Sequence, residues 1–165
     1  MKNVLNKFYF LIILLMAHPV YSDDVSSIRQ MSFGLATDIA KHAVDACFEQ
    51  GYQVAAVVVD RASNVLVSIR HQNANKFTAE IANRKANTVI LGGVSTAEFK
   101  RNRVDILAEM NLVDGIMVLE GGLPIHAAGS LLGGIGVSGA PGGERDAVCA
   151  QKAIDAVQER LDFVE

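Results

Sequence analysis

Hydrophobic residues recur at intervals of three and four positions in four parts of the chain, and this spacing is typical of amphipathic helices. The predicted helices cover residues 26–50, 76–91 and 96–110, and a last one follows the turn 141–143. Glycines stand directly after the first two of these helices, where they favour a helix end. The pattern therefore predicts long helices near both ends of the chain.

Apolar runs between these helices predict five strands, over residues 53–60, 65–71, 116–120, 123–128 and 130–137. Both faces of the first strand are apolar, so we expect it to be central and covered by helices on both sides. The short connection to the second strand favours an antiparallel hairpin. The predicted fold is α+β, a three-layer α/β/α sandwich with a five-stranded antiparallel sheet.

The first 22 residues have the pattern of a secretory signal peptide. Lys2 and Lys7 precede an apolar run that ends before Pro19, and small or tolerable residues follow. The run is too short to span a bilayer comfortably, so no stable membrane span is expected after cleavage. We predict a signal peptide over 1–22, a single domain over 23–165 and a periplasmic or extracellular location. An uncleaved membrane anchor is the alternative.

The charge of the chain argues against a nucleic-acid-binding protein, and its two cysteines allow at most one disulfide within the chain. Removing residues 1–22 lowers Lys+Arg from 15 to 13 against 18 acids, which moves the net charge from -3 to -5. No basic stripe is left for nucleic acid, so we expect no nucleic-acid partner. Cys47 and Cys149 lie in the first and last predicted helices. Two buried free thiols are the simpler expectation, and one disulfide forms if those helices pack side by side.

Gly134, Gly136 and Gly139 satisfy the G-x-G-x-x-G pattern of dinucleotide-binding sites. A dinucleotide fold needs another strand after the following helix, but only about twenty residues follow the glycine-rich run, and the predicted helix takes them up. Glu144 and Asp146 in the first turn of that helix would also repel a pyrophosphate. The glycines therefore indicate close packing or the approach of a flat ligand.

Six short motifs follow one another along the chain: Val57-Val58-Val59-Asp60, Arg70, Lys85-Ala86-Asn87-Thr88, Glu120-Gly121-Gly122-Leu123-Pro124-Ile125, Gly133-Gly134-Ile135-Gly136-Val137-Ser138-Gly139 and Asp146. In this order they resemble the GlcG/HbpS-like family of heme-binding and heme-degrading proteins, over residues 31–157. The resemblance implies a profilin-like fold, assembly into homo-oligomers and, in several members, heme binding. The chain departs from the family pattern after Arg70, where His71 stands in place of an aspartate.

A heme site needs an apolar slot, an axial ligand such as histidine, and a cation or hydroxyl for the propionates. With His18 lost in the signal peptide, the candidate ligands are His71, His126 and His42. His71 and His126 are also the candidate metal ligands. Strand alternation directs His71 toward an apolar layer and Arg70 the other way. Each histidine also has a purely structural interpretation. His71 would bond to a loop carbonyl, His126 would lie on the sheet surface, and His42 would pack on the flank of its helix.

Lys85 falls on the apolar stripe of the second predicted helix, so its stem should be buried toward the sheet. A buried ammonium needs a partner, and Asp60, at the end of the central strand, is the structural candidate. In the other interpretation Lys85 lines a pocket for ligand carboxylates, with Thr88 and Arg70 as companions. These three residues complete the set of candidate cofactor-binding residues.

Three hypotheses follow. The first is a secreted or periplasmic heme-binding homo-oligomer that captures, stores or senses heme; heme degradation rests on the resemblance alone. The second is a small-molecule lyase or isomerase acting on a carboxylate, with Lys85 as the charged or basic group and Arg70 as the clamp. The third is an accessory subunit of a sensor or enzyme that binds no ligand.

Overall fold

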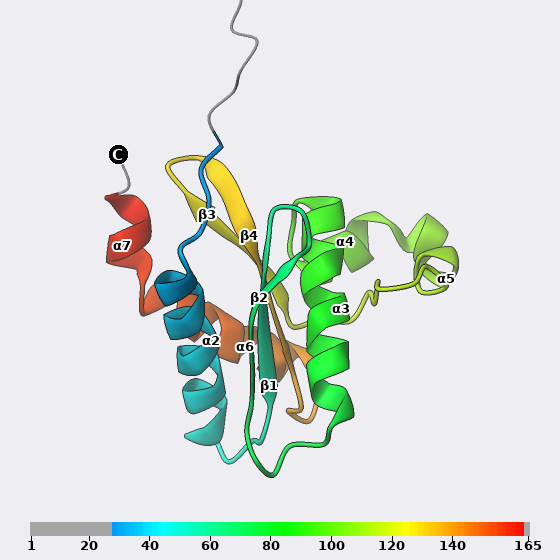
Figure 1. Cartoon of the computed structure of the whole chain (residues 1–165). Helices are drawn as coiled ribbons and strands as arrows, with labels where there is room; N and C mark the ends of the chain where they lie inside the picture. The colour runs from blue at the N-terminus through cyan, green and yellow to red at the C-terminus, as the bar shows by residue number, and fades with distance from the viewer. Residues whose placement is uncertain (1–27, 164–165) are drawn as a thin grey trace, which may run out of the picture.

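The computed structural model describes residues 28–163, which form one antiparallel sheet between two helical layers (Figure 1). The strands are β1 (Ala55–Asp60), β2 (Val65–Arg70), β3 (Gly122–Ala127) and β4 (Ser130–Ser138). They are ordered β2-β1-β4-β3, and every neighbouring pair is antiparallel. The antiparallel arrangement is confirmed, and the prediction of a fifth strand is wrong.

Helices cover both faces of the sheet (Figure 1). The helix α2 (Phe33–Phe48) packs on β1 and β2 and lies beside α6 (Gly143–Asp155), whereas α3 (Phe77–Gly92) packs on β4 and β1 from the opposite face. The remaining elements are short: α4 (Thr96–Asn102), the 3-10 turn η1 (Val104–Ile106), α5 (Leu107–Met110) and α7 (Gln158–Asp162). The predicted three-layer sandwich is therefore confirmed.

Residues 116–120 form no strand, because side chains and nearby turn carbonyls, rather than a neighbouring strand, accept the amides of residues 116–119. The Met117 amide donates to Thr88 Oγ1 at 3.1 Å, and the Thr88 hydroxyl is 3.0 Å from the Met117 carbonyl. The Val118 amide donates to Asn111 Oδ1 at 2.9 Å. The apolar pattern of this segment matches that of a strand, but the segment is fixed to α3 instead.

Two predicted helices differ in length from the observed ones. Residues 28–32 are not helical, and α2 begins at Phe33 because Ser32 Oγ accepts the Leu35 amide at 3.2 Å and so caps the helix. The stretch 96–110 is interrupted at Arg103, whose backbone leaves the helical region (φ -126°, ψ 42°). The predicted signal peptide over 1–22 and the first two residues of the first predicted helix lie outside the described residues.

The central strand has buried side chains on both faces, as predicted. Ala56 and Val58 belong to the core against α2 and α6, and Val57 and Val59 to the core against α3. Alternation of side chains across the strand produces this division. Because α2 covers one face of β1 and α3 covers the other, the side chains of residues 55–59 are buried.

The glycines of β4 allow α3 to approach the sheet. A Cβ on Gly136 would clash with the carbonyl oxygen of Ala82 and lie 2.8 Å from the amide nitrogen of Ala86. A Cβ on Gly134 would lie 3.2 Å from the carbonyl oxygen of Ala86. Of the two interpretations of the glycine-rich run, close packing is therefore confirmed at these positions.

Among the described helices, none is both long enough and apolar enough to cross a membrane.

Candidate functional site

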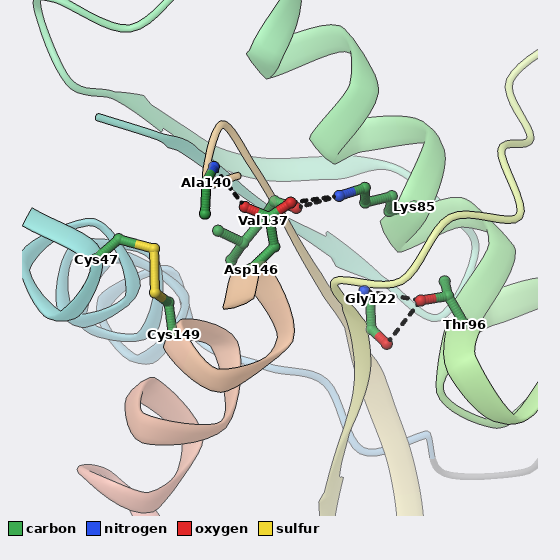
Figure 2. A network of polar contacts seen from close by, with 8 residues as sticks. All are labelled: Cys47, Lys85, Thr96, Gly122, Val137, Ala140, Asp146 and Cys149. Carbon is green, nitrogen blue, oxygen red and sulfur yellow. Dashed lines mark hydrogen bonds and ion pairs between the residues drawn. A yellow bond between two sulfur atoms is a disulfide. The ribbon is translucent and has the colours of Figure 1, made fainter. Parts of the chain in front are cut away.

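Lys85 and Asp146 form a buried ion pair that joins the two helical layers (Figure 2). Lys85 comes from α3 and Asp146 from the first turn of α6. Lys85 Nζ donates to Asp146 Oδ2 and to the Val137 carbonyl, both at 2.8 Å. The two side chains are 3% and 4% exposed. The predicted burial of Lys85 is confirmed.

The environment of Asp146 fixes the turn between β4 and α6. Its Oδ1 accepts the Ala140 amide at 2.9 Å, so both carboxylate oxygens are engaged. Burial raises the pKa of the Asp146 carboxyl above its ordinary value, although Lys85 and the Ala140 amide act in the opposite direction. A Cβ on Gly121 would lie 2.8 Å from Lys85 Nζ, so the chain passes directly against the pair.

Asp60 was the predicted partner of Lys85, and this prediction is wrong. Its Oδ1 accepts the amides of Ala62 and Asn64 at 2.8 and 2.9 Å, and its Oδ2 accepts Asn64 Nδ2 at 3.0 Å. Burial opposes ionisation, but these hydrogen bonds outweigh it and lower the pKa of the Asp60 carboxyl. Asp60 therefore closes the β1–β2 turn, in which Ser63 has a φ of 64°.

Thr88 and Arg70 do not join Lys85 at a common pocket. Thr88 is fully buried and holds the Met117 backbone. Arg70 lies at the end of β2, and its Nη1 donates to the carbonyls of His71 and Ala74. The arrangement required for a lysine base with an arginine clamp is absent from the described part of the chain.

The three candidate histidines lie on different parts of the fold. His71 follows β2 and His126 lies on β3, which are opposite edges of the sheet, and His42 is on an exposed face of α2. His71 and His126 of one subunit therefore cannot bind the same iron. Within residues 28–163, no group of three or more His, Cys, Asp or Glu side chains is arranged to hold a metal ion.

The histidines also differ in their freedom to bind a ligand. The His71 ring stacks on Phe48 with centroids 4.9 Å apart, and its Nδ1 accepts the Asn73 amide at 3.2 Å. The loop thus donates to His71 through an amide, where a bond to a loop carbonyl was expected. His42 and His126 are exposed, and their rings make no hydrogen bond with other described residues.

Cys47 of α2 and Cys149 of α6 form a disulfide, with Cα atoms 5.4 Å apart (Figure 2). Both residues are fully buried. The simpler expectation of two free thiols is therefore wrong, and the alternative, in which the first and last helices pack side by side, is confirmed. The bridge connects positions 102 residues apart.

The protein is an α/β/α sandwich with a four-stranded antiparallel sheet in the order β2-β1-β4-β3. Residues 31–155 match the family described as haem degrading protein HbpS-like. The chain therefore belongs to the HbpS-like family, as the motif order indicated. No match is found among curated proteins.

Solved structures support this assignment. A double mutant of HbpS from Streptomyces reticuli is 31% identical, with a TM-score of 0.76 over 86% of this chain and 97% of that chain. A PduOC:heme complex is 26% identical, with a TM-score of 0.68 over 78% and 95% of the two chains. The Klebsiella pneumoniae protein ORFY, at 24% identity and a TM-score of 0.71 over 86% and 97%, shares the fold.

Proposed function

We propose that this protein binds heme as a homo-oligomer in an oxidising compartment outside the cytoplasm, where it captures, stores or senses heme. The observation that carries the proposal is membership of the HbpS-like family together with similarity to a protein solved in complex with heme. Heme would supply an iron whose axial position a histidine can fill.

The residues of one subunit fit only part of a heme site. A macrocycle needs apolar cover on both faces, and the cavities beside Lys85, Asp60 and Phe99 are not lined by His42, His71 or His126. The exposed histidines can serve as ligands only if another surface covers the heme. A site between two subunits meets this requirement, so the heme proposal and the oligomer proposal depend on each other.

Of the three histidines we favour His126 as the ligand. His126 lies on an edge strand of the sheet, and an edge strand is a surface that a second chain can approach. Its ring is exposed and has no described partner. Binding iron through Nε2 of His71 would require a proton on Nδ1, which now accepts the Asn73 amide. His42 lies on the helical layer rather than at a sheet edge and is the second candidate.

The disulfide supports the export part of the proposal. Disulfides persist in oxidising compartments and are rare in the cytosol. Cys47 and Cys149 are fully buried and bridged between two helices, which is the pattern of a structural bridge. A signal peptide over residues 1–22 would deliver the chain to such a compartment.

Hemin titration of the purified protein tests this function. We expect a Soret shift that saturates with hemin, that is lost in His126→Ala and that is kept in Gln151→Ala, an exposed control position on α6. Size-exclusion chromatography with light scattering should show an oligomer. Absence of a Soret shift in the unmodified protein would refute heme binding, and an unchanged spectrum in His126→Ala would refute this choice of ligand.

His42→Ala and His71→Ala then identify the ligand independently. If one of them abolishes the Soret shift while His126→Ala keeps it, the heme proposal stands with a different histidine. If all three variants keep the shift, histidine ligation itself is wrong.

A further inference from the structure

A cavity of about 400 Å³ opens where α3, the β4–α6 turn and the segment before β3 meet. The Lys85–Asp146 pair lies in its wall, on the side where Figure 2 shows the two side chains meeting beside Val137 and Ala140. This volume is at the lower end of the range for small-molecule sites. Neither the heme proposal nor any candidate histidine involves this cavity.

Unused hydrogen-bond donors line the inner part of this cavity. Lys85 Nζ carries three N–H bonds and uses two of them, on Asp146 and the Val137 carbonyl. Ser138 is 6% exposed, and its hydroxyl has no hydrogen-bond partner among the described residues. Because Ser138 lines the cavity, its hydroxyl can donate to a ligand there.

The beginning of α6 adds backbone donors to the same cavity. The amides of Gly143 and Glu144 make no hydrogen bond to a described backbone carbonyl, as is usual in the first turn of a helix. Both residues line the cavity together with Ser138 and Lys85. These donors are the groups that a carboxylate binds.

The charges at the mouth of the cavity disfavour a ligand that carries negative charge alone. Lys85 and Asp146 neutralise each other, and so do Lys100 and Glu120, whose charged atoms are 3.6 Å apart. The carboxylate of Glu144 has no cationic partner among the residues that line the cavity. The net charge of the lining is therefore -1. A ligand that places a carboxylate on the inner donors needs a cationic group for Glu144.

We propose that this cavity binds a small zwitterion that carries one carboxylate and one ammonium group. The ligand carboxylate accepts from Ser138, Lys85 and the first amides of α6, and the ligand ammonium donates to Glu144. Binding satisfies the Ser138 hydroxyl and the third Lys85 N–H without breaking the ion pair. The proposal is independent of heme binding, since the residues involved are different.

NMR titration of the purified protein with glycine, β-alanine and 4-aminobutyrate tests the proposal. Each probe is compared with a carboxylate and an amine of similar length that lack the second charged group. We expect at least one zwitterion to shift the amide signals of Ser138, Gly143 and Glu144, and to bind more tightly than its matched carboxylate and amine. The proposal is overturned if no probe shifts these signals, or if a singly charged probe binds as tightly.

Two variants test the assigned roles. Ser138→Ala removes one hydrogen bond to the ligand carboxylate and should weaken binding about tenfold or more, whereas Ser130→Ala at the other end of β4 should have no effect. Glu144 is exposed, so Glu144→Gln should weaken binding of the zwitterion by up to about fivefold and remove its advantage over the matched carboxylate. Glu159→Gln on α7 is the control for charge. Unchanged binding in both site variants would overturn the assignment.

Discussion

The two faces of the sheet are held to their helices in different ways. The face covered by α2 and α6 has a large apolar core that includes Ile39, Ile125 and Ile135, and a disulfide joins its two helices. The buried apolar residues against α3 form a much smaller core. Polar side chains compensate for it: Lys85, Thr88 and Thr96 each bind the backbone of another segment.

This difference shows two solutions to one packing problem. Apolar burial is non-directional and tolerates small shifts of a helix on a sheet. Hydrogen bonds between buried side chains and backbone fix both position and angle, and leaving a partner unsatisfied is costly. On the α3 face, the largest losses of stability should therefore come from removing the buried polar side chains or from adding bulk at the glycines. On the α2/α6 face, the largest loss should come from removing the disulfide.

Asp146→Ala should be the most damaging single change. It leaves the Lys85 ammonium buried without a counter-charge, so we expect the free energy of unfolding to fall by about 3–5 kcal/mol in urea denaturation. The control Asp45→Ala removes the partner of Lys41 in an exposed pair and should cost less than about 1 kcal/mol. The double substitution Lys85→Met with Asp146→Leu should recover most of the loss. Equal effects of Asp146→Ala and Asp45→Ala would contradict the burial argument.

Removal of the disulfide should be the largest effect on the opposite face. Replacing Cys47 and Cys149 by alanine frees a closed chain segment of 102 residues in the unfolded state. We expect the free energy of unfolding to fall by about 2–4 kcal/mol. Hydrogen exchange should show protection lost in α2 and α6 before α3. Uniform loss over all three helices would mean that the two faces open together.

Gly136→Ala tests the close approach of α3. The added Cβ meets the Ala82 carbonyl, so α3 must move away, and we expect a loss of about 1–3 kcal/mol. The matched change Gly34→Ala on α2 meets no atom within 4 Å and should stabilise the protein by up to about 1 kcal/mol. Thermal denaturation of both variants measures the contrast. A stabilised Gly136→Ala protein would show that the approach is not tight.

The smallest effect is the order in which two aspartates titrate. Burial raises the pKa of the Asp146 carboxyl above 3.8, so Asp146 is the first of the two to take up a proton as the pH falls, and that proton breaks the ion pair with Lys85. The pKa of Asp60 is lowered below 3.8, so its contribution is present above 3.8 and is lost as the pH falls through the lower folded value. Carboxyl NMR titration should show Asp146 titrating above Asp60, and the reverse order would contradict both assignments.

The site residues differ in how far the sequence predicted them. The burial of Lys85 followed from its place on an apolar helical stripe, because helical periodicity is a local property. Its partner did not follow, because Asp146 is 61 residues away and belongs to the opposite helical layer. The order of family motifs included Asp146, and that was the available signal that the residue matters. The hydrophobic pattern of the sequence does not show that the Ser138 hydroxyl lacks a hydrogen-bond partner.

The expected strand over 116–120 failed for a related reason. Its apolar residues fit a strand, but a strand also needs a neighbour that supplies hydrogen bonds. Thr88 and Asn111 supply them as side chains, and the sequence pattern does not distinguish the two sources. The extent of the first helix was misjudged because the cap at Ser32 competes with continued helical periodicity.

Local patterns along the chain were enough to establish the order of the helices and of the four observed strands, the burial of both faces of β1 and the family. These depend on periodicity and on residue type, which act over a few neighbouring positions. Only the tertiary structure decided the partner of Lys85, the bridge between Cys47 and Cys149, the separation of the histidines onto opposite edges of the sheet, and the cavity beside Ser138. Each of these depends on which distant segments meet, and that is set by the packing of layers on one sheet.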